Sequence, residues 1–143
     1  MNLSKIFDIS GSALSAQTTR LNTIASNLAN ADTASTTPEA AYRARHPVFA
    51  TVLQEATGAG QSTGQPAASV RIAGIVESQA PAIARHEPGH PLADENGYIY
   101  LPAVNTVEQM ADMISASRSY SSSVDVLTTT KELMLRTLQL GRG

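Results

Sequence analysis

The C-terminal stretch from Leu101 to Gly143 constrains the fold most, because nothing in it breaks a helix between Pro102 and Gly141. Apolar residues recur there every seven positions, at Met113, Tyr120, Leu127 and Met134. Others lie three or four residues from these, at Met110, Val124 and Leu138. Such a repeat lines one narrow stripe of a helix, here called the seam, and a seam needs a partner helix to cover it.

The ends of this C-terminal helix are also marked in the sequence. Asn105 and Glu108, three residues apart, can form a capping box, which predicts that the helix begins there. Gly141 is a suitable stop, because glycine takes the left-handed conformation that ends many helices at little cost. At about 1.5 Å per residue, the helix is roughly 50 Å long.

A second helix is predicted over residues 2–31 at the N-terminus. One heptad position holds Phe7, Leu14, Leu21 and Leu28, with Leu3 four residues before the first of them. The other holds Ile24 and Ala31, with Ser10 and Gln17 as polar exceptions. A glycine inside a helix costs about 1 kcal/mol relative to alanine, so Gly11 predicts a weak point, a break or a bend, near Ser10.

The face of this first helix opposite its leucines carries small uncharged side chains, at Thr18, Thr19, Asn22 and Ser26. Two interpretations remain open. The face is a mildly polar surface, or the helix is packed on more than one side within an assembly. The second interpretation fits the scarcity of charge, because a solvated helix face is usually rich in Glu and Lys.

The residues between the helices predict a small, irregular β-rich insert. Residues 32–41 have no apolar periodicity and are expected to form a loop. Strand patterns follow at 42–53, 69–77 and 97–101, and residues 54–68 should be flexible. Pro47 confines the first strand to an edge or splits it.

The expected fold class is therefore mainly α, with two long terminal helices paired as an antiparallel coiled coil and a small β-containing segment between them. The expected division of the chain is an N-terminal helix domain at 1–33, the insert at 34–103 and a C-terminal helix domain at 104–143.

Composition excludes several functions. A net charge of −2 with scattered basic residues offers no footprint for nucleic acid. The chain has no cysteine, so disulfides and thiolate chemistry are excluded. No apolar run approaches the ~20 residues of a membrane span. The N-terminus is interrupted by polar residues where a signal peptide needs an unbroken apolar segment, so no cleaved signal is expected.

The segment His86-Glu87-Pro88-Gly89-His90 matches the zinc-protease pattern H-E-x-x-H. That chemistry requires both histidines on one face of a helix, and the Pro-Gly pair at its centre prevents a helix. We expect a turn whose imidazoles form local hydrogen bonds; zinc hydrolysis is a weak alternative. No nucleophile elbow or phosphate loop is present either, so we expect neither an enzyme nor a cofactor.

Two polar features allow alternative interpretations. Asn27 and Asn30 are either caps at a fraying helix end or amides that fix the register between packed helices. In the C-terminal helix we expect Tyr120 in the core, whereas Arg118 is either solvated or reaches a neighbouring chain.

The segment from Ser10 to Thr33, with Leu-Asn-Thr-Ile-Ala-Ser-Asn-Leu-Ala-Asn at 21–30, resembles the N-terminal signature of the bacterial flagellar basal-body rod protein family. Glu87–Tyr120 and Lys131–Gly141 are similar to its proximal rod members. Two departures are visible, because the family commonly has asparagine where this chain has Ala103 and Ser123.

The resemblance implies a structural subunit that assembles helically into the rod, the drive shaft that crosses the periplasm and transmits torque for motility. Such subunits leave the cytoplasm through the flagellar type III export apparatus without a cleaved signal. Expected partners are further copies, rod proteins of types B and F, the distal rod protein and the junction protein of type E between hook and basal body. Alternatives are another axial subunit, distal rod or hook-like, or a small periplasmic binding module built on a helical hairpin.

The residues expected at the assembly interface all lie on the two helices. They are Leu14, Leu21, Ile24, Asn27, Leu28, Asn30, Met110, Met113, Tyr120, Val124, Leu127, Met134 and Leu138.

Overall fold

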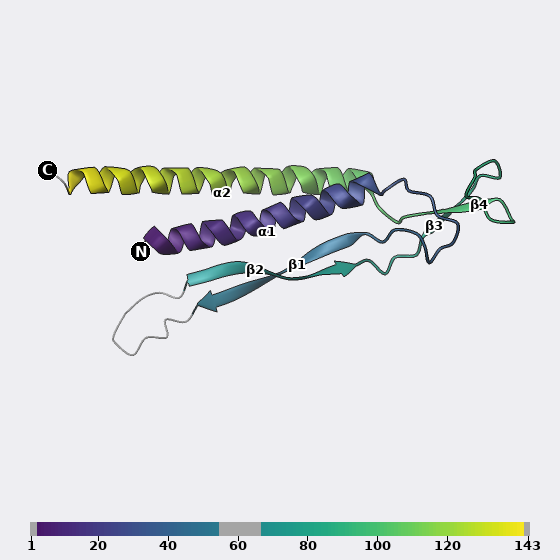
Figure 1. The fold of residues 1–143 in the computed structure, drawn as a ribbon, viewed down its shortest axis with the longest axis horizontal. Helices are drawn as coiled ribbons and strands as arrows, with labels where there is room; N and C mark the ends of the chain where they lie inside the picture. Colours follow the sequence, from purple (N-terminus) through teal and green to yellow (C-terminus); the bar gives the residue numbers. More distant parts are fainter. Residues whose placement is uncertain (1–2, 55–66, 142–143) are drawn as a thin grey trace.

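The fold consists of two long helices at the ends of the chain and two small antiparallel sheets between them (Figure 1). The computed structural model describes residues 3–54 and 67–141. Helix α1 spans Leu3–Ala29 and helix α2 spans Thr106–Leu140. The prediction of a mainly helical chain with a small β insert is confirmed.

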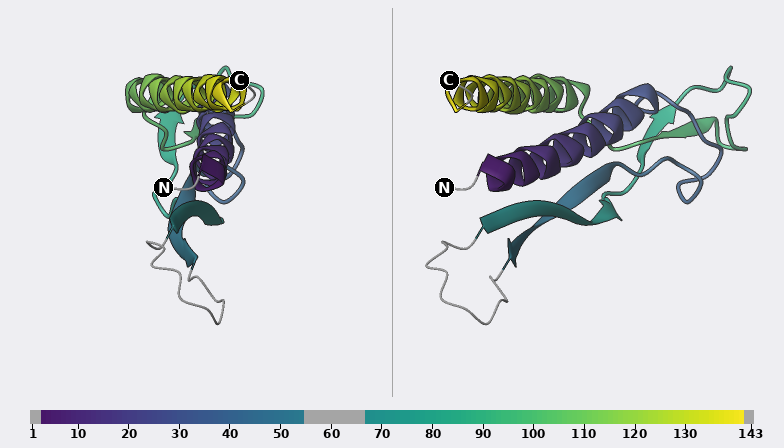
Figure 2. Two further views of the ribbon diagram at one scale, coloured as in Figure 1. Left: turned by 90° about the vertical axis from the view of Figure 1, so that its left-hand side faces the viewer. Right: turned by 60° about the vertical axis from the view of Figure 1, so that its left-hand side comes forward.

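The helices run side by side in opposite directions, so that the two ends of the chain lie at the same end of the molecule (Figure 1). The two-stranded sheet of β1 (Arg45–Gln54) and β2 (Ala67–Glu77) covers the other side of α1, which makes α1 the middle layer (Figure 2). The second sheet, of β3 (Ile83–His86) and β4 (Tyr98–Leu101), lies at the opposite end from the termini, beyond the start of α2. The helix pair is antiparallel as expected; its packing as a coiled coil stays a prediction.

Helix α1 continues without a break through Gly11, so the break considered at Ser10 and Gly11 does not occur. The residue after the glycine makes one bond within the helix and one to the sheet. The Ser12 hydroxyl donates to the carbonyl of Ile9, 2.8 Å away, and accepts the Val70 N–H of β2 at 3.2 Å. The helix is thus bound to the sheet at Ser12, the residue that follows the helix-weakening Gly11.

Helix α2 begins as the sequence predicts and ends differently. The Asn105 side chain accepts the backbone N–H groups of Val107 and Glu108, which confirms this residue as the N-cap. Gly141 follows the last helical residue but has φ −81°, a right-handed conformation. The expectation of a left-handed glycine was wrong, because the last turn closes with the Gly141 N–H on the Thr137 carbonyl.

Strand β1 (Arg45–Gln54) pairs antiparallel with β2 (Ala67–Glu77), with an irregularity between Val48 and Phe49. The pair is here called the β1–β2 ribbon. Pro47 is tolerated in β1 because a two-stranded sheet has only edge strands. The expectation of a flexible 54–68 was wrong at both ends, where strand pairing holds residues 54, 67 and 68. Its remainder, 55–66, lies outside the described residues.

Strand β3 (Ile83–His86) was not predicted; it pairs with β4 (Tyr98–Leu101), which was. All four β3 residues are exposed, so the strand has no alternation to signal it. Residues 87–97 form turns between the two strands, as expected for the Pro-Gly segment. Gly97 has φ +81°, a conformation that favours glycine.

The core is small and built mainly from alanine. The buried apolar residues are Ala16, Ile24, Ala31, Ala41, Ala44, Ile99 and Ala116. The largest fully buried side chains are those of Ile99 and Asn27. A chain with so few large buried groups keeps much of its apolar surface exposed.

Candidate assembly surface

Asn27 joins the three layers of the fold. Its side chain, on α1, is 1% exposed and makes four hydrogen bonds. The carboxamide oxygen accepts the Tyr42 hydroxyl at 2.9 Å and the Arg45 N–H at 2.8 Å. The amide nitrogen donates to the Arg45 carbonyl at 2.9 Å and to Gln109 Oε1 on α2 at 3.0 Å. We call these four residues the Asn27 junction.

The hydrogen bonds of Asn27 and Asn30 show that the two asparagines play different roles. Asn27 is an amide that bridges packed elements, and its hydrogen-bonding capacity is fully used, as a buried amide requires. Asn30, the residue after α1, instead donates its amide N–H to the Ser26 carbonyl at 2.8 Å, the same carbonyl that accepts the Asn30 backbone N–H at 3.2 Å. The two side chains, three residues apart, therefore do different things.

Within the chain, α2 meets α1 through a line of small and polar residues. Gln109, Ala116 and Thr130 are buried, and Ser123 between them is half-buried, so a seven-residue repeat is present. The expected second line of the seam, Met110, Val124 and Leu138, is exposed. The apolar pattern therefore pointed to the wrong side of α2 for its contact with α1. The contact is made by small and polar residues, because alanine and threonine let two helices approach closely.

The residues expected at the assembly interface fall into three groups. Ile24 and Asn27 are buried. The half-buried ones are Leu14, Leu21, Leu28, Asn30, Met113 and Leu127. The exposed ones are Met110, Tyr120, Val124, Met134 and Leu138, between 37% and 61%. Tyr120 was expected in the core, but its side chain is 38% exposed, so that expectation was wrong. Arg118 is exposed as well.

Exposed apolar side chains gather on two elements. On α2 they include Val107, Ile114, Leu133, Leu135 and Leu140 besides the five above. On the β1–β2 ribbon they are Val48, Phe49, Val52, Ile75 and Val76. Exposed apolar side chains are candidates for contacts with other molecules. We therefore take these two elements as the candidate assembly surface; that the α2 residues contact other subunits stays a prediction.

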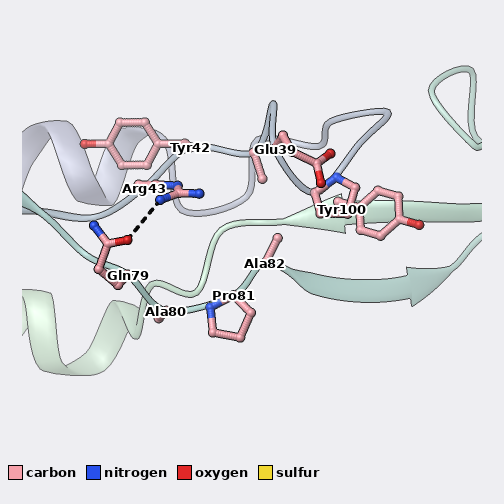
Figure 3. Close-up of a pocket in the computed structure, with 10 residues that line it drawn as sticks. Glu39, Tyr42, Arg43, Gln79, Ala80, Pro81, Ala82 and Tyr100 are labelled. Atoms are coloured by element: carbon pink, nitrogen blue, oxygen red, sulfur yellow. Dashed lines mark hydrogen bonds between the residues drawn. The ribbon is translucent and has the colours of Figure 1, made fainter.

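A cleft of about 310 Å³ lies where the insert leaves the helices, between residues 38–43 and 79–82 (Figure 3). Arg43 Nη1 donates to Gln79 Oε1 across it at 3.4 Å. Apart from these, its lining is mainly alanine, proline and tyrosine, with Glu39 as the carboxylate. The described lining holds no nucleophile paired with a base, so it offers no catalytic arrangement.

The H-E-x-x-H segment forms no metal site in the described chain. His86 lies in β3 with its ring 5.0 Å from that of Tyr98, whereas His90 Nδ1 accepts the Leu92 N–H at 3.1 Å. The local hydrogen bond expected for the imidazoles is confirmed at His90. No group of three potential metal ligands occurs among residues 3–54 and 67–141.

Family models match both helical ends of the chain. "Flagella basal body rod protein" covers residues 7–34, and "Flagellar basal body rod FlgEFG protein C-terminal" covers residues 95–140. The chain is 49% identical over 142 residues to the flagellar basal-body rod protein FlgC of Salmonella typhimurium, with 99% of this chain and 100% of that protein covered. The chain belongs to the flagellar basal-body rod protein family.

Other FlgC proteins are similar over the same span. That of Yersinia enterocolitica is 50% identical over 142 residues, with 99% of this chain and 100% of that protein covered. That of Borreliella burgdorferi is 32% identical over 155 residues, with 100% of both chains covered. The resemblance seen in the sequence is therefore confirmed, and the family is one of structural rod proteins and not of enzymes.

The two family models fall on the two helices and on β4, so the β1–β2 ribbon lies between the matched parts. No described helix has the length and apolar character to cross a membrane.

Proposed function

We propose that this chain is a structural subunit of the proximal rod of the flagellar basal body. The observation that carries the proposal is its similarity to FlgC along 99% of its length, with rod-family models on both helices. Assembly with other rod and basal-body components follows from family membership.

The exposed apolar residues of α2 are the contact surface that this proposal requires. Met110, Val124 and Leu138 repeat along the helix and are 56%, 37% and 61% exposed. A contact between two different surfaces of identical or related subunits generates an open helical filament when its rotation does not close into a ring. Burial of such side chains on assembly contributes about 25 cal/mol per Å² of apolar surface.

The partners that fit this role are further rod subunits, of types B and F and of the distal rod, and the junction protein of type E. The proposed location is the part of the rod that crosses the periplasm, reached through the type III export apparatus without a cleaved signal. Family membership supports a basal-body location. The finer assignments rest on the resemblance to proximal rod proteins.

Complementation tests the proposal. In a strain that lacks its own copy of this gene, the full chain restores basal bodies and motility, and chains without residues 1–33 or 104–143 do not. Truncated chains that still enter purified basal bodies would overturn the proposed role of the helices. A chain that stays monomeric in the periplasm would instead support the alternative of a helical binding module.

A point variant separates assembly from folding. Leu138→Glu places a charge on an exposed apolar position, so the isolated chain should keep its stability while incorporation into basal bodies falls. Thr129→Glu adds the same charge at another exposed position of α2 and serves as the matched control. Equal incorporation of both variants would remove Leu138 from the assembly surface.

A further inference from the structure

We propose that the Asn27 carboxamide couples the pairing of α1 and α2 to the seating of the β1–β2 ribbon, so that the ribbon is fixed only when α2 lies against α1. The inference rests on the proposed function, because it describes how a rod subunit would control one of its contact surfaces. It is carried by the geometry of the Asn27 junction.

The two ends of the carboxamide serve different elements. Its oxygen is used entirely by the insert, through Tyr42 and the Arg45 N–H at the start of β1. Its nitrogen is shared between the Arg45 carbonyl and Gln109 of α2. One planar group therefore holds the root of the ribbon with three hydrogen bonds and α2 with the fourth.

Asn27 is the direct hydrogen-bonded link between these elements in the described structure. The backbones of the ribbon strands approach α1 closely and do not approach α2 closely. A cavity of about 350 Å³, lined by Arg45, Phe49 and Gln109 among others, lies between the start of α2 and the ribbon. Movement of α2 thus reaches the ribbon through the junction.

Burial makes the link energetically strong. With α2 in place, Asn27 is 1% exposed and Gln109 is 5% exposed. Removal of α2 leaves one amide N–H without its partner and admits water, which competes for the bonds to Tyr42 and Arg45. Hydrogen bonds weaken on exposure because the surrounding dielectric constant rises. The root of the ribbon then opens more often.

Other contacts of the ribbon and of its root with α1 do not depend on α2. The Val70 N–H donates to the Ser12 hydroxyl at 3.2 Å, and at the root the Ser26 and Tyr42 hydroxyls lie 3.3 Å apart. These contacts keep the ribbon near α1, but neither of them holds the backbone of Arg45, which bonds to Asn27. In a subunit whose α2 does not lie against α1, the exposed apolar side chains of the ribbon would therefore have no fixed orientation. Assembly would press α2 onto α1 and so orient them.

Amide hydrogen exchange of the purified full chain tests the coupling, read on peptides that cover residues 42–50 and 106–115. Asn27→Ala should accelerate exchange at the root of the ribbon about tenfold or more, since tenfold corresponds to about 1.4 kcal/mol and a lost buried hydrogen bond costs about that much. Gln109→Ala should accelerate exchange there as well, although it alters α2 and not the insert. In the Asn27→Ala background, Gln109→Ala should have no further effect on residues 42–50.

The matched control is Asn30→Ala, which removes an amide that bonds to the Ser26 carbonyl of α1 and to neither the insert nor α2, and which should leave exchange at residues 42–50 unchanged. If α2 of the isolated chain exchanges freely, trimethylamine N-oxide is added to favour burial. If it still exchanges freely, the comparison is made on isolated basal bodies. Under any of these conditions, a protected ribbon root beside an unprotected 106–115 overturns the proposal, as does additive behaviour of Asn27→Ala and Gln109→Ala.

The outcome is independent of the rod assignment. If the wild-type chain fails to restore basal bodies while the exchange data show coupling, the proposed function fails and the coupling stands. If basal bodies form and the effects of Asn27→Ala and Gln109→Ala are additive, the coupling fails and the proposed function stands.

Discussion

The Arg20 guanidinium of α1 donates a 2.9 Å hydrogen bond to the Asp112 carboxylate of α2, within one helical turn of the Asn27–Gln109 contact on α2. The two ionic side chains are 28% and 44% exposed, so water screens their attraction. The pair therefore aligns the helices more than it stabilises them.

Arg20→Gln should lower the free energy of unfolding by about 0.2–1 kcal/mol, the range of exposed ion pairs. The loss should shrink in high salt, because salt screens the attraction in the wild-type chain. Urea unfolding followed by far-UV circular dichroism measures both. Arg118→Gln, at an exposed position of α2 without an ion pair among the described residues, is the control and should change stability little. A loss for Arg20→Gln that is independent of salt would show that packing of the arginine stem dominates.

Ala116 is 0% exposed on the face of α2 that packs against α1. Ala116→Leu should lower the free energy of unfolding by about 1–3 kcal/mol, because a tightly packed site has no room for a larger side chain. Ala111→Leu makes the same substitution at an exposed position of α2 and should be close to neutral. Thermal unfolding of both purified variants provides the comparison, and equal melting temperatures would mean that α2 does not pack on α1 at Ala116.

The two helices could be predicted because each depends on local signals. The asparagine cap at Asn105 and the long stretch without helix breakers are read directly from the sequence, and both agree with the structure. Strands β2 and β4 likewise carry alternation or a bordering turn. The exposed strand β3 carries neither, because it exists through pairing with β4 alone.

The contact between the helices could not be predicted from apolar spacing. The helix pair buries Gln109, Ala116 and Thr130, which a search for large apolar residues passes over, and it leaves Met110 and Leu138 exposed. Asn27 was recognised as unusual, but its partners Tyr42 and Arg45 come from the insert and required the fold to be known.

Asp94 provides a prediction of pH dependence. The Tyr98 N–H, with smaller contributions from the Asn96 N–H and the Tyr100 hydroxyl, holds the pKa of this carboxyl below its ordinary value. A lowered pKa in the folded state stabilises the turn above the unfolded pKa of about 3.9. That contribution is lost as the pH falls through the lowered folded value.

Exchange of the Tyr98 amide proton, followed by nuclear magnetic resonance across the acidic range, measures this loss. Asp94→Asn should accelerate exchange at neutral pH and remove the acid-dependent change. Glu95→Gln, at the exposed neighbouring residue, should preserve it. An unaltered acid profile in Asp94→Asn would assign the transition to another carboxyl group.

Gln17 of α1 has a side-chain oxygen, Oε1, that is buried without a hydrogen-bond partner among the described residues. An unsatisfied buried polar atom costs about 1–3 kcal/mol, so Gln17→Leu should raise the free energy of unfolding by about 1 kcal/mol. Urea unfolding measures the change. Gln139→Leu makes the same substitution at an exposed position of α2 and should change stability by less than about 0.5 kcal/mol. If Gln17→Leu destabilises the chain, the carboxamide must be hydrated or bonded in solution, and the packing around Gln17 is looser than the burial of its oxygen indicates.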